Sequence, residues 1–205
     1  KFIDEYPYSA EAWYNLGYLY FRSELYEKSA DAYDYAIVAK EDFIPAYFGK
    51  ANALTELKQY YEAIEIYKES LRFHAPDAEV YYSIGECYEK AENYHRAITY
   101  YRKAIKFNPD MGEAWLGAGV VLDCLDRQLE AKHFIRRAVE VEKNNGEFWY
   151  LYANILRSLG EYDDAVKAYE KSITLSPENI NVWLDFSTLY YDNANISEAF
   201  RTISR

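Results

Sequence analysis

Large aromatic residues recur along this chain at a constant interval of 34 residues, and no other property of the sequence limits the fold as strongly. Six positions carry these aromatics, with no insertion or deletion between them: Trp13, Tyr47, Tyr81, Trp115, Trp149 and Trp183. A constant period of roughly 20 to 50 residues is typical of repeat proteins, in which one small structural motif stacks on its neighbours. The chain is therefore expected to be an array of similar repeats.

Small and bulky residues recur in the same register, and each set of equivalent positions is called a column here. A small residue stands four positions after each aromatic, at Gly17, Ala51, Gly85, Gly119, Ala153 and Ser187. A second small column lies 16 positions after each aromatic, at Ser29, Ala63, Ala97, Ala131, Ala165 and Ala199. A bulky column follows four positions later, at Tyr33, Tyr67, Tyr101, Ile135, Tyr169 and Ile203. Spacings of three and four place these columns on helix faces, so the sequence predicts two closely packed helices per repeat.

The columns resemble those of the tetratricopeptide repeat (TPR) family, whose repeat is a 34-residue helix–turn–helix. The family motif W-x2-L-G-x2-Y reads here as Trp13, Leu16, Gly17 and Tyr20. In the third repeat it reads Tyr81, Ile84, Gly85 and Tyr88, followed by Ala97, Tyr101 and Pro109. The resemblance covers essentially the whole chain. It implies an all-α fold, a right-handed α-solenoid (alpha-alpha superhelix) of stacked TPR helix pairs.

The register divides residues 1–205 into the repeats of a single TPR array. Complete repeats are expected at 10–43, 44–77, 78–111, 112–145 and 146–179, with an incomplete repeat at 180–205. Residues 1–9 are expected to be the tail of a preceding repeat, because Pro7 falls at the position equivalent to Pro109 and Pro177. The chain is therefore predicted to be a fragment of a longer array.

Two repeats depart from the family pattern. Lys50 in the second repeat and Ala118 in the fourth occupy the usual Leu position, and Gln128 replaces the tyrosine that other repeats carry at the turn. We expect Leu125 and Leu129 to compensate for the changes in the fourth repeat.

The formal net charge of -11 argues against nucleic acid as a partner. Binding to phosphates needs clustered Lys and Arg, and the helical repeats that read RNA have a period of about 35 residues rather than 34. No run of about 18 apolar residues occurs, so no membrane insertion by this chain is expected. The sequence therefore favours proteins or peptides as partners.

Cysteine, histidine and glycine show no pattern of a metal, cofactor or catalytic site. Cys87 and Cys124 are too few for a disulfide framework, which favours a reducing compartment such as the cytoplasm, and localisation is otherwise unspecified. No zinc-ligand spacing and no complete phosphate-binding glycine motif occurs. Gly117 and Gly119 form a GxG without a third glycine, which indicates close helix packing. The sequence therefore predicts no cofactor and no enzymatic activity.

The resemblance implies that the first helix of each repeat lines a groove that holds a peptide or a helix of a partner. With stations numbered from the first residue of each repeat, the groove takes stations 2, 5, 6, 9, 12 and 13, and these 36 positions hold 10 acids and 3 bases. Two interpretations stay open, because four of the acids begin their helices, where the macrodipole favours carboxylates: Glu11, Glu79, Glu113 and Glu147. A functional acidic groove predicts a partner with basic and apolar residues.

The candidate partner-binding residues are bulky, amide and charged side chains at these stations. They are Tyr14, Tyr18, Phe21, Phe48, Asn52, Tyr82, Glu86, Glu89, Tyr150, Asn154 and Arg157. Tyr18 and Phe21 are the strongest, with contact to an upstream repeat as the alternative. Asn52 and Asn154 occupy station 9, where TPR proteins often hold a peptide backbone with an asparagine. Station 5 holds Tyr, Phe or Leu and station 2 mostly Glu, in place of the Lys and Arg of the clamp that grips the C-terminal carboxylate of chaperones, so that clamp is expected to be absent.

These observations favour a non-catalytic protein–protein interaction scaffold. The alternative is a regulatory or targeting module of a larger enzyme, signalling or envelope-associated chain whose other domains lie outside this sequence. Glu86 and Glu89 have the spacing of an acid pair, but such pairs ordinarily mark a solvated helix face. Self-association through the cut repeat ends is a further expectation, with apolar residues of the last repeat packing on another copy: Leu184, Phe186, Leu189 and Phe200.

Overall fold

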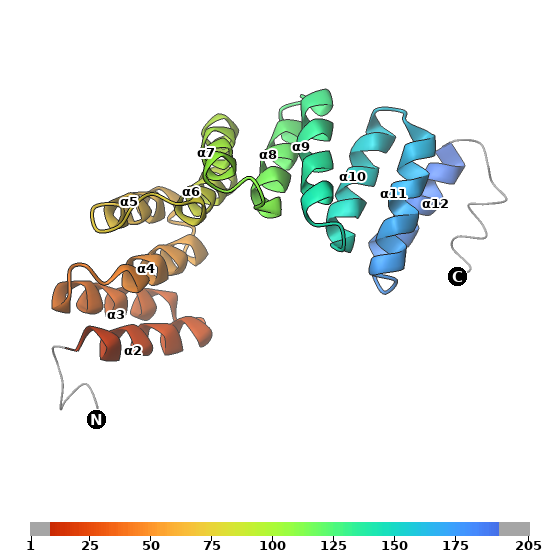
Figure 1. Cartoon of the computed structure of the whole chain (residues 1–205). Helices are drawn as coiled ribbons and strands as arrows, with labels where there is room; N and C mark the ends of the chain where they lie inside the picture. The colour runs from red at the N-terminus through yellow and green to blue at the C-terminus, as the bar shows by residue number, and fades with distance from the viewer. Residues whose placement is uncertain (1–8, 193–205) are drawn as a thin grey trace. The chain divides into compact units, whose positions relative to one another are not determined.

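The computed structural model describes residues 9–192, and within this range the chain is helical and contains no strand (Figure 1). The helices are α2 (Ala10–Arg22), α3 (Tyr26–Ala39), α4 (Ile44–Glu56), α5 (Tyr60–Ser70), α6 (Ala78–Lys90), α7 (Tyr94–Phe107), α8 (Gly112–Cys124), α9 (Gln128–Val141), α10 (Gly146–Ser158), α11 (Tyr162–Leu175) and α12 (Ile180–Asp192). The predicted all-α fold of helix pairs is confirmed. Residues 1–8 of the expected tail, and the column positions Ala199 and Ile203, lie outside the described residues, as does Phe200.

Several helices begin at side chains that accept hydrogen bonds from the first backbone N–H groups. Ser9 accepts from the N–H of Ala12 at the start of α2, and Asp77 accepts from that of Val80 at the start of α6. Asn145 does the same for α10. Such caps satisfy donors that have no partner inside the helix, so local sequence helps to set where these helices begin.

The turn inside every described helix pair has the same backbone. Three residues separate the helices, and the middle one lies in the left-handed region: Glu24 (φ 58°), Lys58 (φ 60°), Glu92 (φ 56°), Asp126 (φ 57°) and Gly160 (φ 75°). The next residue donates its N–H to a carbonyl five residues back, as Leu25 does to Tyr20 and Glu161 does to Leu156. This is the bonding of a helix end that usually selects glycine, yet four of the five turns use another residue.

The chain divides into two compact bodies, which are described separately. The N-terminal body contains α2 to α7 and the C-terminal body contains α8 to α12.

In the N-terminal body the small columns lie under aromatic rings. A Cβ at Gly17 would lie 2.9 Å from the Tyr33 ring, and one at Gly85 would lie 2.7 Å from the Tyr101 ring. Lys50, at a position that usually holds Leu, is half-buried and pairs with Asp34 at 2.6 Å.

In the C-terminal body a hydrophobic cluster joins α10, α11 and α12. Tyr169 and Phe186 stack with their ring centroids 5.4 Å apart, and Leu156 and Leu189 are buried beside them. The expectation that Phe186 and Leu189 are available to another copy is therefore wrong, because α11 of the same chain covers them. Leu184 remains exposed.

Of the two leucines expected to compensate in the fourth repeat, Leu125 is half-buried and Leu129 does not reach the core. Ala118 is fully buried, whereas Leu129 on α9 is 74% exposed and contributes nothing to the core. The expectation for Leu129 was therefore wrong. Gly119 explains the close packing instead, because a Cβ there would press into the Ile135 side chain and lie 3.3 Å from the Ala131 carbonyl oxygen.

The aromatic column that revealed the repeat connects four of the first helices, α4, α8, α10 and α12, to the loops before them. Trp115 Nε1 donates to the Pro109 carbonyl at 2.8 Å, and Trp149 and Trp183 donate at 2.9 Å to carbonyls six residues before them. Tyr47 makes the same six-residue connection through its hydroxyl. At these four positions a buried or half-buried ring also donates a hydrogen bond, which both Trp and Tyr can do.

Candidate functional site

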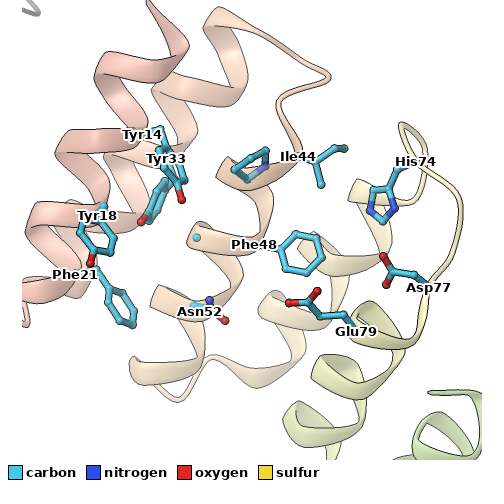
Figure 2. A pocket seen from close by; sticks show the side chains of 12 residues that line it. Tyr14, Tyr18, Phe21, Tyr33, Ile44, Phe48, Asn52, His74, Asp77 and Glu79 are labelled. Atoms are coloured by element: carbon cyan, nitrogen blue, oxygen red, sulfur yellow. The ribbon is translucent and has the colours of Figure 1, made fainter. Parts of the chain in front are cut away.

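A groove of about 680 Å³ opens on the N-terminal body, between α2, α4 and the start of α6 (Figure 2). Its walls are Tyr14, Tyr18, Phe21, Tyr33, Ile44, Pro45, Phe48, Gly49, Asn52, His74, Asp77 and Glu79. Five of the candidate residues from the sequence lie together here: Tyr14, Tyr18, Phe21, Phe48 and Asn52.

Aromatic rings form the floor and one end of the groove. Phe48 lies centrally, with its ring edge-on to Tyr67 at a centroid distance of 5.5 Å. Tyr14 is held by Tyr33 at 5.5 Å, while Tyr18 is 47% exposed and open to a ligand. An exposed, amphipathic tyrosine beside rigid rings is the kind of surface that protein interfaces favour.

The opposite end of the groove carries carboxylates. Figure 2 shows Asp77 and Glu79 on the far side of Phe48 from Tyr18 and Phe21. Asp77 uses one carboxylate oxygen to cap α6, and Glu79 is exposed. The groove therefore runs from an aromatic end to an acidic end.

A loop that is longer than its equivalents supplies part of the acidic end. Helix α5 has 11 residues, whereas α3 and α7 have 14, so residues 71–77 form a loop that brings His74 and Asp77 to the groove. Pro76 in this loop disfavours a longer helix, because the residue before a proline avoids the helical region. The station pattern did not include these two residues, although the unusual place of Pro76 was readable in the sequence.

The amide of Asn52 is held in one orientation by a buried tyrosine. Tyr67 Oη donates to Asn52 Oδ1 at 2.6 Å, and burial raises the pKa of Tyr67, which keeps the hydroxyl protonated as a donor. With its oxygen engaged, Asn52 presents its Nδ2 donors. The same pair recurs in the C-terminal body, where Tyr169 donates to Asn154 Oδ1 at 2.5 Å. Sequence reasoning missed these tyrosines as partners because they belong to the bulky core column.

The candidates of the third repeat form a hydrogen-bonded group of their own. Tyr82 Oη donates to Glu86 at 3.1 Å, and Tyr101 donates to the Glu89 carboxylate. Burial raises the pKa of both carboxyl groups. These two acids therefore do not lie on an ordinary solvated face.

Glu89→Gln is expected to raise the melting temperature at pH 7 by about 2 °C, because it removes a charge from a partly buried position. The native state binds the Glu89 proton more tightly than the unfolded chain does, so this group lowers stability as pH rises through its raised native pKa. The difference between variant and wild type should therefore shrink as pH falls toward the ordinary glutamate pKa of about 4.3.

Thermal denaturation followed by circular dichroism across this pH range measures the effect. Glu170→Gln, at an exposed position of α11, is the matched control and should leave the melting temperature unchanged. A lower melting temperature for Glu89→Gln at pH 7 would mean that the hydrogen bond from Tyr101 outweighs the burial of the charge.

The candidates of the C-terminal body share one face of α10 and contact α12. Tyr150 donates to Asp185 at 2.5 Å, and Arg157 donates to Thr188 at 2.8 Å and lies 3.9 Å from the Asp185 carboxylate. These two side chains therefore join neighbouring repeats. Asn154 lies between them on the same helix.

Among residues 9–192, no three His, Cys, Asp or Glu side chains gather as ligands for a metal ion. No helix in the described part of the chain combines the length and the apolar character needed to cross a bilayer.

Models of the tetratricopeptide repeat match four segments, residues 1–42, 44–73, 78–111 and 146–179, which together cover more than half of the chain. The chain belongs to the tetratricopeptide repeat family. The TPR fold is generally a non-enzymatic interaction module, and the repeats support a role for this TPR protein as a protein–protein interaction scaffold. A search of curated proteins gave no match.

Solved TPR structures share the fold at low sequence identity. The pilF protein of Pseudomonas aeruginosa is 18% identical, with a TM-score of 0.79 over 98% of this chain and 90% of that one. YrrB, described as a TPR protein with an unusual peptide-binding site, is 21% identical, with a TM-score of 0.65 over 88% and 93%. The Cut9 and Hcn1 assembly of the APC/C is 19% identical, with a TM-score of 0.75, and this TPR chain spans only 40% of the matched chain.

Proposed function

We propose that this TPR protein is a non-catalytic scaffold that binds a peptide of a partner protein in the groove of its N-terminal body. One observation carries the proposal, namely that the exposed Tyr18, half-buried aromatic rings, an oriented amide and two carboxylates line a single groove of about 680 Å³. YrrB carries a peptide-binding site on the same fold, which is consistent with this use.

The groove defines the chemistry of its ligand. An apolar side chain would pack between Tyr18, Phe21 and Phe48, where large rigid rings bury area at low entropic cost. A lysine or arginine would approach Asp77 and Glu79 at the other end. Asn52 would donate from Nδ2 to a backbone carbonyl of the peptide, since Tyr67 already occupies its oxygen.

Asn52→Ala is expected to weaken a peptide with Lys and Leu residues by about tenfold, the effect of losing about one to two kcal/mol of hydrogen bonding. Tyr67→Phe should weaken it by a smaller factor, because the amide remains but is no longer oriented. Tyr169→Phe removes the equivalent hydrogen bond in the C-terminal body and is the matched control. Fluorescence anisotropy of a labelled peptide measures all three.

Affinity should also fall when salt rises from about 0.05 to about 0.5 M, because screening weakens the ion pairs at the acidic end. Wild-type affinity in Asn52→Ala and in Tyr18→Ala would reject the groove. An affinity that does not change with salt would contradict a basic partner. An equal loss of affinity in Tyr169→Phe would mean that the peptide binds elsewhere.

A further inference from the structure

Helix α7 carries charge of one sign only. Its residues include Arg96, Arg102, Lys103 and Lys106, and it contains no Asp or Glu, whereas each of the other described helices contains at least one acid. The chain as a whole has a formal net charge of -11. Helix α7 is therefore locally positive in a chain whose net charge is negative.

A continuous row of aromatic rings crosses α5, α6 and α7 beside these bases, and we call it the aromatic row. Successive centroids lie 6.3 Å apart between Tyr61 and Tyr88, 5.3 Å between Tyr88 and Tyr100, 6.2 Å between Tyr100 and Tyr81, and 5.3 Å between Tyr81 and Phe107. The two ends of the row are open, with Tyr61 57% and Phe107 53% exposed. The row therefore presents apolar area to solvent within a basic surface.

The bases of α7 lie on the aromatic row and keep their charge available. The Arg96 guanidinium lies 5.5 Å from the Tyr88 centroid, and Lys103 Nζ lies 4.4 Å from that of Tyr100. Arg96, Lys103 and Lys106 are exposed, and within residues 9–192 none of the three is paired with a carboxylate. A cation over a ring is positioned without being neutralised, so it can still bind an anion.

Three acids of the neighbouring helices α5 and α6 already have partners. Glu65 on α5 pairs with Lys68 at 2.7 Å, at the border of the aromatic row. Glu86 and Glu89 on α6 accept hydrogen bonds from Tyr82 and Tyr101, which are not members of the row. Arg96, Lys103 and Lys106 are therefore left without an ion pair to a carboxylate of α5 or α6.

We propose that the aromatic row and the exposed bases of α7 form a second docking surface, which binds an acidic segment of a partner protein. The segment carries Asp or Glu residues on either side of an aromatic or aliphatic residue. Charge complementarity selects the acids, and the open rings at Tyr61 and Phe107 bury the apolar residue. This surface shares no residue with the groove, so it does not depend on the proposed function.

A short acidic peptide fits this surface better than a nucleic acid does. At physiological salt the Debye length is about 8 Å, so a short segment is influenced mainly by the local bases. A long polyanion would also extend over the acidic remainder of the chain, where its phosphates would be repelled.

The test uses the whole chain and a fluorescein-labelled peptide in which glutamates flank a single phenylalanine. The triple variant Arg96→Gln, Lys103→Gln, Lys106→Gln is expected to bind this peptide at least tenfold more weakly, because it loses the exposed bases without disturbing the core. The control variant Lys132→Gln, Arg136→Gln, Arg137→Gln changes the net charge equally, but at bases that are paired with Glu161 and Glu140. It should bind as the wild type does.

Two further variants separate this surface from the groove. Phe107→Ser should weaken binding of the acidic peptide by several-fold, and Asn52→Ala should leave its affinity unchanged. Wild-type affinity in the α7 triple variant would overturn the proposal, as would an equal loss in the control triple variant. A single-stranded RNA of the same charge that binds more tightly than the peptide would also overturn it. So would salt-sensitive dimerisation of the chain that the triple variant abolishes, because a second copy would then be the occupant.

Discussion

Leu156→Ala is expected to lower the free energy of unfolding by about 3 kcal/mol, within the range measured for buried leucines. Leu156 is 1% exposed and lies in the cluster that joins α10, α11 and α12, with Tyr169 and Val182 beside it. Removing its isobutyl group leaves a cavity that Tyr169 cannot fill, because that ring is held by its stack on Phe186 and by its hydrogen bond to Asn154.

Urea denaturation followed by circular dichroism measures this loss, and the midpoint should fall without a change in slope. Leu129→Ala is the matched control, since Leu129 is 74% exposed on α9 and its loss should change stability by no more than about 0.5 kcal/mol. Similar losses in the two variants would contradict the description of Leu156 as a core residue. Repeat arrays can unfold in parts. The same comparison, followed by a spectroscopic probe placed within α10 to α12, shows whether the loss of stability is confined to these helices.

Gly119→Val is expected to cost about 3 kcal/mol through overpacking. A Cβ at Gly119 would overlap the Ile135 side chain and lie 3.2 Å from the Ile135 backbone nitrogen, and valine adds two methyl groups to that Cβ. Helix propensity acts in the other direction, since glycine inside a helix is less favourable than alanine by about 1 kcal/mol. The clash outweighs that gain, because α8 would have to move away from α9.

A double-mutant cycle with Ile135→Ala tests the cause of this loss. Ile135→Ala alone opens a cavity, but in its presence valine at position 119 meets less side chain. The stability loss of the double variant should therefore be smaller than the sum of the two single losses by at least about 1 kcal/mol. Simple additivity would show that Gly119 is needed for some reason other than contact with Ile135. A stabilising Gly119→Val would show that helix propensity decides at this position.

The sequence predicted the helical fold well because each column has one physical cause. Ser29 and Ala131 are small because another helix crosses there, and both are fully buried. Trp115 and Tyr47 could be equated because both can fill the same space and donate the same hydrogen bond. A residue type that recurs every 34 positions reports a shared packing requirement, and such requirements are local.

The groove was predicted less completely, for two physical reasons. His74 and Asp77 reach it through a loop that exists only where α5 ends early, and a repeat pattern describes what repeats share rather than where one differs. The roles of Tyr67 and Tyr169 were missed because a core tyrosine can fill space with its ring and orient an amide with its hydroxyl.

Net charge concealed the basic surface on α7. A total of -11 argues against phosphate-rich partners, but it averages over helices that differ in sign, and contacts respond to the local charge. Phe186 and Leu189 were misplaced because α11 covers them, so the last repeat could not be judged from its own sequence alone.

The five identical turns between paired helices have a consequence for how such a chain can change. Each turn joins its helices by three residues around one left-handed residue, whether that residue is Glu24, Lys58 or Gly160. Four of the five connections between successive pairs have four residues, and the fifth, residues 71–77, is longer and supplies His74 and Asp77 to the groove. The turn inside each helix pair is thus kept the same, while the connector after a pair can change in length and sequence. A change in a connector can therefore create a new binding surface without altering the fold of any helix pair.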